Sequence, residues 1–310
     1  MNDLKKSLII FSKSDYQLLN AIIAIRKNNQ VYEELIICHL GYWNNQSLLR
    51  HHIEGHKFTF FDNENEVLSY IKNKKIDIIS AKFNPLLKIN LNIDKYICID
   101  DGLGSYANFF HLYKAAIREK NTIKLKLLYP VYFFATIIMH KLGFYEKDHV
   151  YKNGEIDVEY KNHLLKILSE LAIDHNANKL EIKNKNRVLF CSQPYVDLGV
   201  LSTAEYEIFL NKVQNYFGEN ILILKHPGDK LFSYKGYDVV ECDMFEIFMA
   251  NNINNISVVT SINSTCLLTA SSVFDIRSIS FHDEKTKNLN DSFSKEIELL
   301  WNKYIFRVGI

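Results

Sequence analysis

The chain has 310 residues, of which 47% are hydrophobic and 24% are charged, and its formal net charge is +1. These values are typical of a soluble globular protein, and a chain of more than about 250–300 residues usually divides into two domains. A charge so close to zero argues against the broad basic surface of a nucleic-acid-binding protein.

The first part of the chain alternates short apolar runs with amphipathic segments. Residues 15–28 have helical spacing, because Leu18, Leu19 and Ile22 recur on one face, and residues 67–72 form a second helical segment. The runs that favour strands are 8–11, 35–38, 57–61, 76–80 and 96–99. Strands separated by helices predict βαβ units and a parallel sheet that is covered on both faces.

The middle of the chain contains an apolar segment, residues 127–139, with Lys124 and Lys126 before it and His140 and Lys141 after it. The segment is too short to span a bilayer. We expect a core helix, or a contact of a homodimer through residues 124–145. The alternative is a segment that lies on a membrane surface, because basic residues flank it.

The alternation begins again after a polar, lysine-rich stretch at 176–186, which we interpret as an inter-domain linker. The later elements are predicted strands at 188–191, 221–224, 239–241, 256–260 and 279–281, and predicted helices at 204–217, 245–250 and 295–306. We therefore predict an α/β protein of two Rossmann-like domains, with parallel sheets facing a central cleft. The expected boundaries are 1–150 for the first domain, 151–186 for a connecting region and 187–310 for the second domain.

A polar motif, Asp100-Asp101-Gly102, follows the predicted strand at 96–99. Ligands of parallel α/β sheets bind beyond the carboxyl ends of the strands, so the two carboxylates are candidates for a site. Adjacent residues leave an extended strand on opposite sides, and we expect at most one of the two to point at a ligand. A polar turn is the structural alternative.

Three further motifs follow strands of the second half, namely Ser192-Gln193-Pro194 with Asp197, Lys225-His226-Pro227, and Asn263-Ser264-Thr265. A histidine at a strand end can donate a hydrogen bond or a proton to a leaving phosphate. Hydroxyl side chains at a helix N-terminus form an anion site, together with the free backbone N–H groups and the helix dipole. The structural alternatives are a loop carboxylate, a strand-end turn and a helix cap.

These motifs resemble those of glycosyltransferase family 52, the bacterial lipooligosaccharide and capsule sialyltransferases, over residues 8–282. The resemblance rests on residues 15–21, Asp100-Asp101-Gly102, Ser192-Gln193-Pro194, His226-Pro227 and Ser264-Thr265. The chain departs from the family at Gly228, where arginine commonly follows the His-Pro pair, and at Asp197, since a family carboxylate can follow the proline directly. The resemblance implies the GT-B architecture, with an acceptor-side first domain and a second domain that binds the nucleotide sugar.

The resemblance also implies an inverting, metal-independent transfer of sialic acid from CMP-sialic acid to a hydroxyl of a terminal galactose-type sugar on a bacterial surface glycan. The base would be Asp197 or Asp101, of which the family pattern favours Asp197, and His226 would assist the departing phosphate. The other implied residues are Ser192, Gln193, Pro194, Lys225, Pro227, Asn263, Ser264 and Thr265 on the donor side, and Asp100 and Gly102 on the acceptor side. The chain has no Asp-x-Asp motif, and we expect no metal and no cofactor besides the donor substrate.

Two other functions stay open at the level of sequence. One is a glycosyltransferase of the same fold that uses a UDP-hexose or another CMP-ulosonic acid, and the other is a non-catalytic protein that binds a nucleotide or a sugar. The apolar run near the N-terminus is too short for a signal peptide, and the five cysteines are far apart. We therefore expect free thiols and a cytoplasmic protein, with peripheral contact to the inner membrane as an option.

Overall fold

The computed structural model describes residues 6–28, 31–39, 57–72, 74–102, 104–106, 109, 112–113, 117, 122–174, 187–242, 244–289 and 294–310. The chain divides into two compact units. The first comprises Met1–Lys152 and Asp157–Leu164, and the second comprises Asn153–Ile156 and Leu165–Ile310. The stretch at 176–186, interpreted above as a linker, lies outside the described residues.

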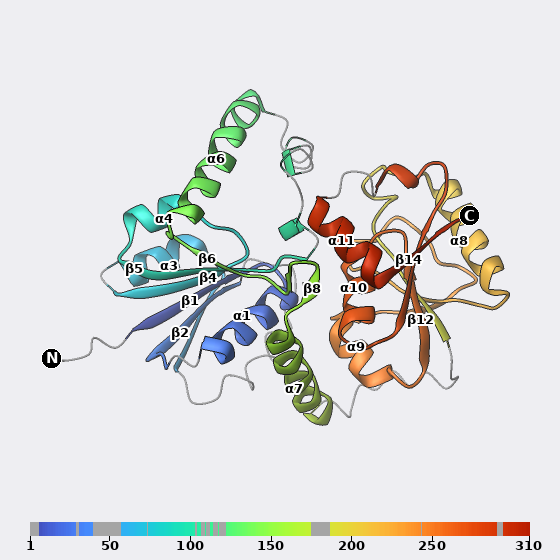
Figure 1. Ribbon diagram of the computed structural model, residues 1–310, viewed down its shortest axis with the longest axis horizontal. Coiled ribbons are helices and arrows are strands. Elements are labelled where there is room, and N and C mark those ends of the chain that lie inside the picture. The colour runs from blue at the N-terminus through green and yellow to red at the C-terminus, as the bar shows by residue number, and fades with distance from the viewer. Residues whose placement is uncertain are drawn as a thin grey trace. The chain divides into compact units, whose positions relative to one another are not determined.

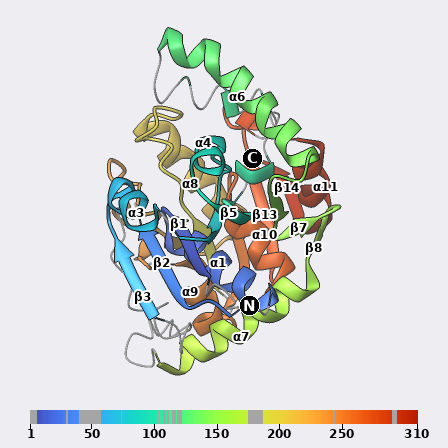
Figure 2. The same cartoon turned by 90° about the vertical axis from the view of Figure 1, so that its left-hand side faces the viewer.

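The first unit is built on a six-stranded parallel sheet with the order β3-β2-β1-β4-β5-β6 (Figure 1). Its strands are β1 (Ser7–Ser12), β2 (Glu34–His39), β3 (Lys57–Phe61), β4 (Ile76–Ser80), β5 (Ile93–Ile99) and β6 (Glu146–Asp148). Figure 2 shows β3, β2 and β1 side by side. The central strands are apolar along most of their length, because a parallel sheet is covered on both faces.

The helices of the first unit begin at recognisable signals. They are α1 (Asp15–Asn28), α3 (Glu64–Ile71), α4 (Pro85–Asn90), the short 3₁₀ turn η2 (Gly104–Tyr106) and α6 (Ile123–Lys141). Asn63 and Asn84 cap α3 and α4 by accepting a hydrogen bond from a backbone N–H of the first turn, and Pro85 occupies the first helical position of α4. A short hairpin of β7 (Tyr151–Lys152) and β8 (Glu155–Ile156) and the helix α7 (Val158–Asp174) follow.

The second unit repeats the strand order of the first, with the sheet β11-β10-β9-β12-β13-β14, again all parallel. Its strands are β9 (Arg187–Cys191), β10 (Leu222–Leu224), β11 (Asp238–Val240), β12 (Ile256–Ser261), β13 (Arg277–His282) and β14 (Ile305–Gly309). Its helices are α8 (Thr203–Phe217), α9 (Phe245–Asn252), α10 (Thr265–Ser272), the 3₁₀ turn η4 (Lys287–Leu289) and α11 (Lys295–Tyr304). A capping box of Ser202 and Glu205 starts α8, and Gly218, with φ at 66°, ends it.

Each sheet has its own apolar core. In the first unit the core joins one face of the sheet to α3 and α4, through residues that include Ile9, Ile36, Val67, Ile78 and Tyr96. In the second unit the core joins the sheet to α8, through residues that include Phe190, Tyr206, Phe209, Ile223 and Phe281. These cores leave the loops at the carboxyl ends of the strands free to carry polar groups.

The prediction of an α/β protein with two parallel sheets is confirmed, and several elements differ from the expectation. The strand at 279–281, the last one predicted, is followed by one more strand in the second sheet. The edge strand is β14, which takes the last residues of the predicted helix at 295–306. The polar strand β6 and the helix α7 had no counterpart in the prediction. Helix α6 is not a core helix, because many of its large apolar side chains are exposed.

Candidate functional site

Each sheet has a point where the chain connections leave in opposite directions, between β1 and β4 in the first unit and between β9 and β12 in the second. Loops at such points diverge and leave room for ligands beyond the carboxyl ends of the strands. The motifs singled out from the sequence follow β5 in the first unit, and β9, β10 and β12 in the second. The last three strands are neighbours in their sheet, so their loops lie at one edge.

His226, just after β10, has a defined protonation pattern. Its Nδ1 accepts a hydrogen bond of 3.0 Å from the backbone N–H of Gly228, which leaves the ring proton on Nε2. Burial lowers the pKa of His226, so the ring is neutral near pH 7. A Cβ on residue 228 would lie 3.2 Å from Nδ1, so the glycine leaves room for the ring. The imidazole is thus a neutral hydrogen-bond donor through Nε2.

A buried chain of hydrogen bonds joins the loop of His226 to the end of β9. The Oγ of Ser192 accepts from the backbone N–H of His226 at 2.8 Å and donates to Oδ2 of Asp229 at 2.9 Å. The hydroxyl of Tyr234 donates to the same Oδ2. Asp229 is 1% exposed, burial raises its pKa, and its Oδ1 has no hydrogen-bond partner among the described residues. These hydrogen bonds hold the loop of His226 in one position.

The N-terminus of α10 lies beside the same loops. Ser264 is buried and caps the helix by accepting from a backbone N–H of the first turn, and Thr265 is the first helical residue. The side-chain amide of Gln193 donates to Oγ of Ser264 at 3.3 Å, which ties the loop after β9 to the helix. Asn263 accepts a hydrogen bond from the hydroxyl of Tyr195. The N–H groups of this helix start and the hydroxyls beside them favour an anion.

Other predicted residues of the second unit are engaged in structural contacts. The carboxylate of Asp197 accepts hydrogen bonds from the backbone N–H groups of Lys230, at 3.1 Å, and Leu231, at 3.3 Å. Asp197 thereby holds the backbone of the loop that follows His226. The ammonium of Lys225 forms an ion pair of 3.0 Å with Glu241. Pro227 is exposed, and Pro194 lies beside Gly228.

The two carboxylates after β5 have different surroundings. Asp100 is 1% exposed, its Oδ2 accepts from the hydroxyl of Tyr106 and from the backbone N–H of Val150, and burial raises its pKa to about 7. Asp101 is partly exposed, and its Oδ1 accepts from the side-chain amide of Gln17. Gly102, with φ at 76°, takes the left-handed conformation of the turn that follows.

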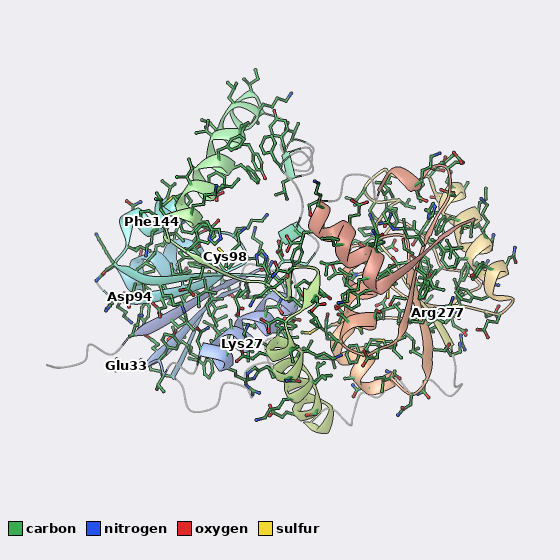
Figure 3. All side chains as sticks on the ribbon, viewed as in Figure 1. Lys27, Glu33, Asp94, Cys98, Phe144 and Arg277 are labelled. Carbon is green, nitrogen blue, oxygen red and sulfur yellow. The ribbon has the colours of Figure 1, made fainter. Side chains whose placement is uncertain are left out.

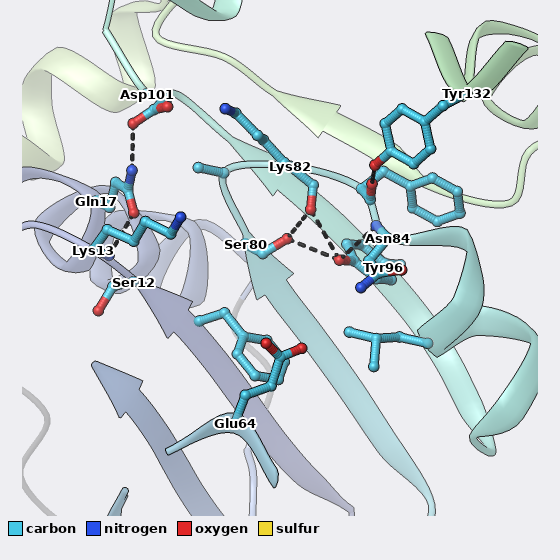
Figure 4. A pocket seen from close by; sticks show the side chains of 14 residues that line it. Ser12, Lys13, Gln17, Glu64, Ser80, Lys82, Asn84, Tyr96, Asp101 and Tyr132 are labelled. Atoms are coloured by element: carbon cyan, nitrogen blue, oxygen red, sulfur yellow. Dashed lines mark hydrogen bonds between the residues drawn. The ribbon is translucent and has the colours of Figure 1, made fainter. Parts of the chain in front are cut away.

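Asp101 lines a cavity of about 330 Å³ in the first unit, at the carboxyl ends of β1, β4 and β5 (Figure 4). The polar side chains around it are Ser12, Lys13, Gln17, Glu64, Ser80, Lys82, Asn84, Tyr96, Asp101 and Tyr132. The hydroxyl of Tyr96 bonds Ser80, and Tyr132 donates to the backbone carbonyl of Phe83, which fixes the aromatic wall. A cavity of this size and mixed polarity lies at the small end of sites for organic ligands, roughly 300–1,000 Å³.

Several residues of these sites were missed from the sequence. Asp229 stands three residues after His226, but only the fold shows that it is buried and bonded to Ser192. Gln17 lies on α1, far in sequence from Asp101. In the part of the chain that the structure describes, no three His, Cys, Asp or Glu side chains are grouped to hold a metal ion.

No protein-family model matches this chain, and no curated protein sequence matches it. Solved structures match over nearly its whole length. The 2,6-sialyltransferase of Photobacterium sp. JT-ISH-224, solved with CMP and lactose, is 12% identical, with 97% of this chain and 78% of that chain covered and a TM-score of 0.52.

A UDP-GlcNAc 2-epimerase is equally similar. The enzyme of Methanocaldococcus jannaschii, solved with UDP-GlcNAc and UDP, is 14% identical, with 98% of this chain and 89% of that chain covered and a TM-score of 0.54. MnaA of Staphylococcus aureus, solved with UDP, is 12% identical over 98% of this chain and 84% of that chain, with a TM-score of 0.53. These likenesses, together with the two parallel six-stranded sheets, confirm the expected GT-B fold.

Proposed function

We propose that this chain is an inverting sialyltransferase that moves sialic acid from CMP-sialic acid to a hydroxyl of a galactose-type sugar. The observation that carries the proposal is the set of groups at the carboxyl edge of the second sheet. There His226 has a neutral imidazole with its proton on Nε2, and its backbone N–H bonds Ser192, whose neighbour Gln193 bonds the residue that caps α10. Such a set suits a departing phosphate monoester, which carries negative charge on its oxygens.

In this proposal His226 acts as a hydrogen-bond donor to the phosphate of CMP. A ring that is already neutral is a poor proton donor, whereas its Nε2–H can stabilise the charge that develops as the bond to the sugar breaks. Ser264, Thr265 and the N–H groups at the start of α10 would share that charge. The chain's own donors would therefore take the place that a metal occupies in other transferases, and we propose that the reaction needs none.

We assign the base to Asp101. Its carboxylate lines a cavity that can hold a sugar, and the bond from Gln17 orients it. In the transfer it would take the proton of the acceptor hydroxyl while that oxygen attacks the anomeric carbon, and the bond to the CMP oxygen breaks. Asp197 is less suited to this role, because its carboxylate already accepts hydrogen bonds from Lys230 and Leu231. The acceptor side of the enzyme would then be the first unit.

The comparisons support both a CMP-sugar and a UDP-sugar enzyme. The solved complex of the Photobacterium enzyme contains CMP and lactose, which motivates the donor and the acceptor proposed here. The second candidate is an enzyme that acts on a UDP-sugar, favoured by the equally good fold match to UDP-GlcNAc 2-epimerase. The nucleotide therefore separates the two candidates.

The test is to incubate the full chain with CMP-sialic acid and lactose and to follow release of CMP and formation of sialyl-lactose by mass spectrometry. We expect both products, inhibition by added CMP and no inhibition by UDP. Parallel incubations contain UDP-GlcNAc in place of the donor. Consumption of UDP-GlcNAc, or displacement of the donor by UDP, would contradict the proposal in favour of the second candidate. Binding of CMP without any release from CMP-sialic acid would mean a non-catalytic protein.

A further inference from the structure

Helix α6 exposes a continuous row of apolar side chains to solvent. The row consists of Leu127, Val131, Phe134 and Ile138 of the helix and Leu142 just after its end. Their spacings of four, three, four and four residues place them on one face. All five are exposed, with Leu127 at 68% and Phe134 at 56%. We call this row the apolar stripe. The helix extends away from the sheet of its unit in Figure 1.

The opposite face of α6 already has partners within the first unit. Tyr132 donates to the carbonyl of Phe83, Phe109 packs on Phe133, and Tyr145 bonds the carbonyl of Thr136. These contacts attach one side of the helix to its unit. Within the stripe, Phe134 also stacks on Phe109 at a ring-centroid distance of 5.8 Å, while all five side chains of the row stay exposed. Figure 3 shows Phe144 at the attached end of the helix. Contiguous exposed apolar side chains on a protein surface mark interaction sites.

Within residues 122–145, which comprise α6 and its two ends, every charged residue is basic. Between residues 122 and 145 the sequence contains no Asp or Glu, and its basic groups are Lys124, Lys126, His140 and Lys141. Lys126 and Lys141 are exposed at the two ends of the helix. An apolar face with cations at its ends and aromatic residues along its length is typical of a helix that lies in the headgroup region of a membrane.

The same charges argue against a second copy of this chain as the occupant. In an antiparallel pair of α6 helices Lys126 would meet Lys141 of the partner, and in a parallel pair each lysine would meet its own counterpart. Like charges face each other in both arrangements, and no carboxylate of the segment relieves them. In the described parts of the chain no helix is long and apolar enough to cross a membrane.

We propose that the apolar stripe of α6 docks the protein on an anionic lipid bilayer. The stripe enters the boundary between headgroups and acyl chains, and Lys126 and Lys141 contact anionic headgroups. The helix of 19 residues, at about 1.5 Å per residue, gives a contact of roughly 28 Å along the surface. This docking does not depend on the proposed chemistry, because the surface is outside both candidate sites.

The test is co-sedimentation of the full chain with vesicles of phosphatidylcholine alone or with added phosphatidylglycerol, without any nucleotide sugar. We expect binding to the anionic vesicles, weakened at high salt. The double variant Phe134→Ser/Ile138→Ser should bind at least about tenfold more weakly than the parent chain, since two large apolar groups no longer enter the bilayer. The variant Lys126→Gln/Lys141→Gln should lose about thirtyfold on anionic vesicles, at roughly fivefold per lysine, and nothing on neutral ones.

The matched control is Ile208→Ser/Leu299→Ser, which removes two apolar side chains of similar exposure, 57% and 60%, from α8 and α11. It should bind vesicles like the parent chain, and circular dichroism should show that all variants fold. Absence of vesicle binding by the parent chain overturns the proposal, as does unchanged binding by the stripe variant. A dimer in sedimentation velocity that the stripe variant abolishes, without lipid binding, would identify a second copy as the occupant instead.

Discussion

The two units have the same strand order, but their polar residues are organised in different ways. In the second unit the groups after β9, β10 and β12 bond to one another, as in the chain from His226 through Ser192 to Asp229. In the first unit Asp101 and Gln17 line an open cavity of about 330 Å³. Groups that are already fixed stabilise developing charge without reorganisation, whereas an open cavity leaves room for a bulkier ligand.

The comparison teaches that the topology decides where ligands bind and the loops decide which ligands. Both units place their polar groups at the carboxyl ends of the strands, as expected for the point where the strand order reverses. The second unit adds a helix N-terminus and a neutral imidazole, which suit an anion. The first unit adds a carboxylate that can accept a proton. Each of the following predictions tests a residue of one unit by an effect that the other unit should not produce.

The largest effect is expected at the base. Asp101→Asn should lower turnover by about 10²–10⁴-fold, the usual contribution of a general base, and leave CMP affinity unchanged because CMP is assigned to the second unit. Turnover from CMP release and affinity from calorimetry give the two numbers. Asp197→Asn is the matched control and should cost much less. If it costs as much as Asp101→Asn or more, the base belongs to the second unit.

The next effect is expected at the imidazole. His226→Ala should lower turnover by about 10²–10³-fold, as loss of one preorganised donor does. Because burial lowers the pKa of His226, the neutral donor form persists as the pH falls, and the acid limb of kcat/KM should lie below the ordinary histidine value of about 6.5. If His226→Ala keeps the turnover of the parent chain, His226 does not stabilise the departing phosphate, and the role proposed for the second unit is wrong.

A third prediction concerns the buried acid of the first unit and is measured as stability. Burial raises the pKa of Asp100 from 3.8 to about 7, so between these values the folded chain holds a proton that the unfolded chain has released. This contribution to stability is present at low pH and is lost as the pH rises toward 7 and beyond.

Asp100→Asn carries no titrating proton. Relative to this variant, the parent chain should therefore lose about 2–3 kcal/mol between pH 5 and pH 8. Denaturant unfolding of both proteins at each pH measures the difference. A difference that does not change with pH would mean that Asp100 is ionised throughout.

The smallest effect is expected at Asp229, a positioning residue that acts through Ser192. Asp229→Asn should lower turnover roughly tenfold, the worth of one hydrogen bond to a charged group. The charge of Asp229 raises the pKa of His226, so its removal should move the acid limb of the pH profile to lower pH. Tyr234→Phe keeps the carboxylate and should leave that limb in place. If the acid limb of Asp229→Asn lies at the same pH as that of the parent chain, Asp229 has a structural role only.

Much of the fold and the location of the sites could be predicted from local pattern. The helix at 15–28 and the strands at 57–61 and 76–80 agree with α1, β3 and β4, because their apolar spacing is strong and their ends carry turn residues. The polar motifs follow β5, β9, β10 and β12, so they lie at the carboxyl edge of each sheet as the sequence predicted. The opposite directions of Asp100 and Asp101 followed from strand alternation alone.

The rest depends on contacts between distant segments. The strand β6 is a polar sequence that becomes a strand only by pairing with β5, and β14 follows α11 without a break because β13 offers it an edge. The burial of Asp229 and the engagement of Asp197 by Lys230 are set by how the loops pack. The sequence left open whether α6 is a core helix or an exposed one, because an apolar sequence does not reveal whether the protein itself covers it.

The most direct test of the central claim is a structure of the protein with CMP bound. The account predicts a phosphate oxygen at about 2.7–3.2 Å from Nε2 of His226, with the remaining oxygens toward Ser264, Thr265 and the first N–H groups of α10. A nucleotide seated in the cavity beside Asp101, or one whose phosphate avoids both His226 and the start of α10, would contradict it.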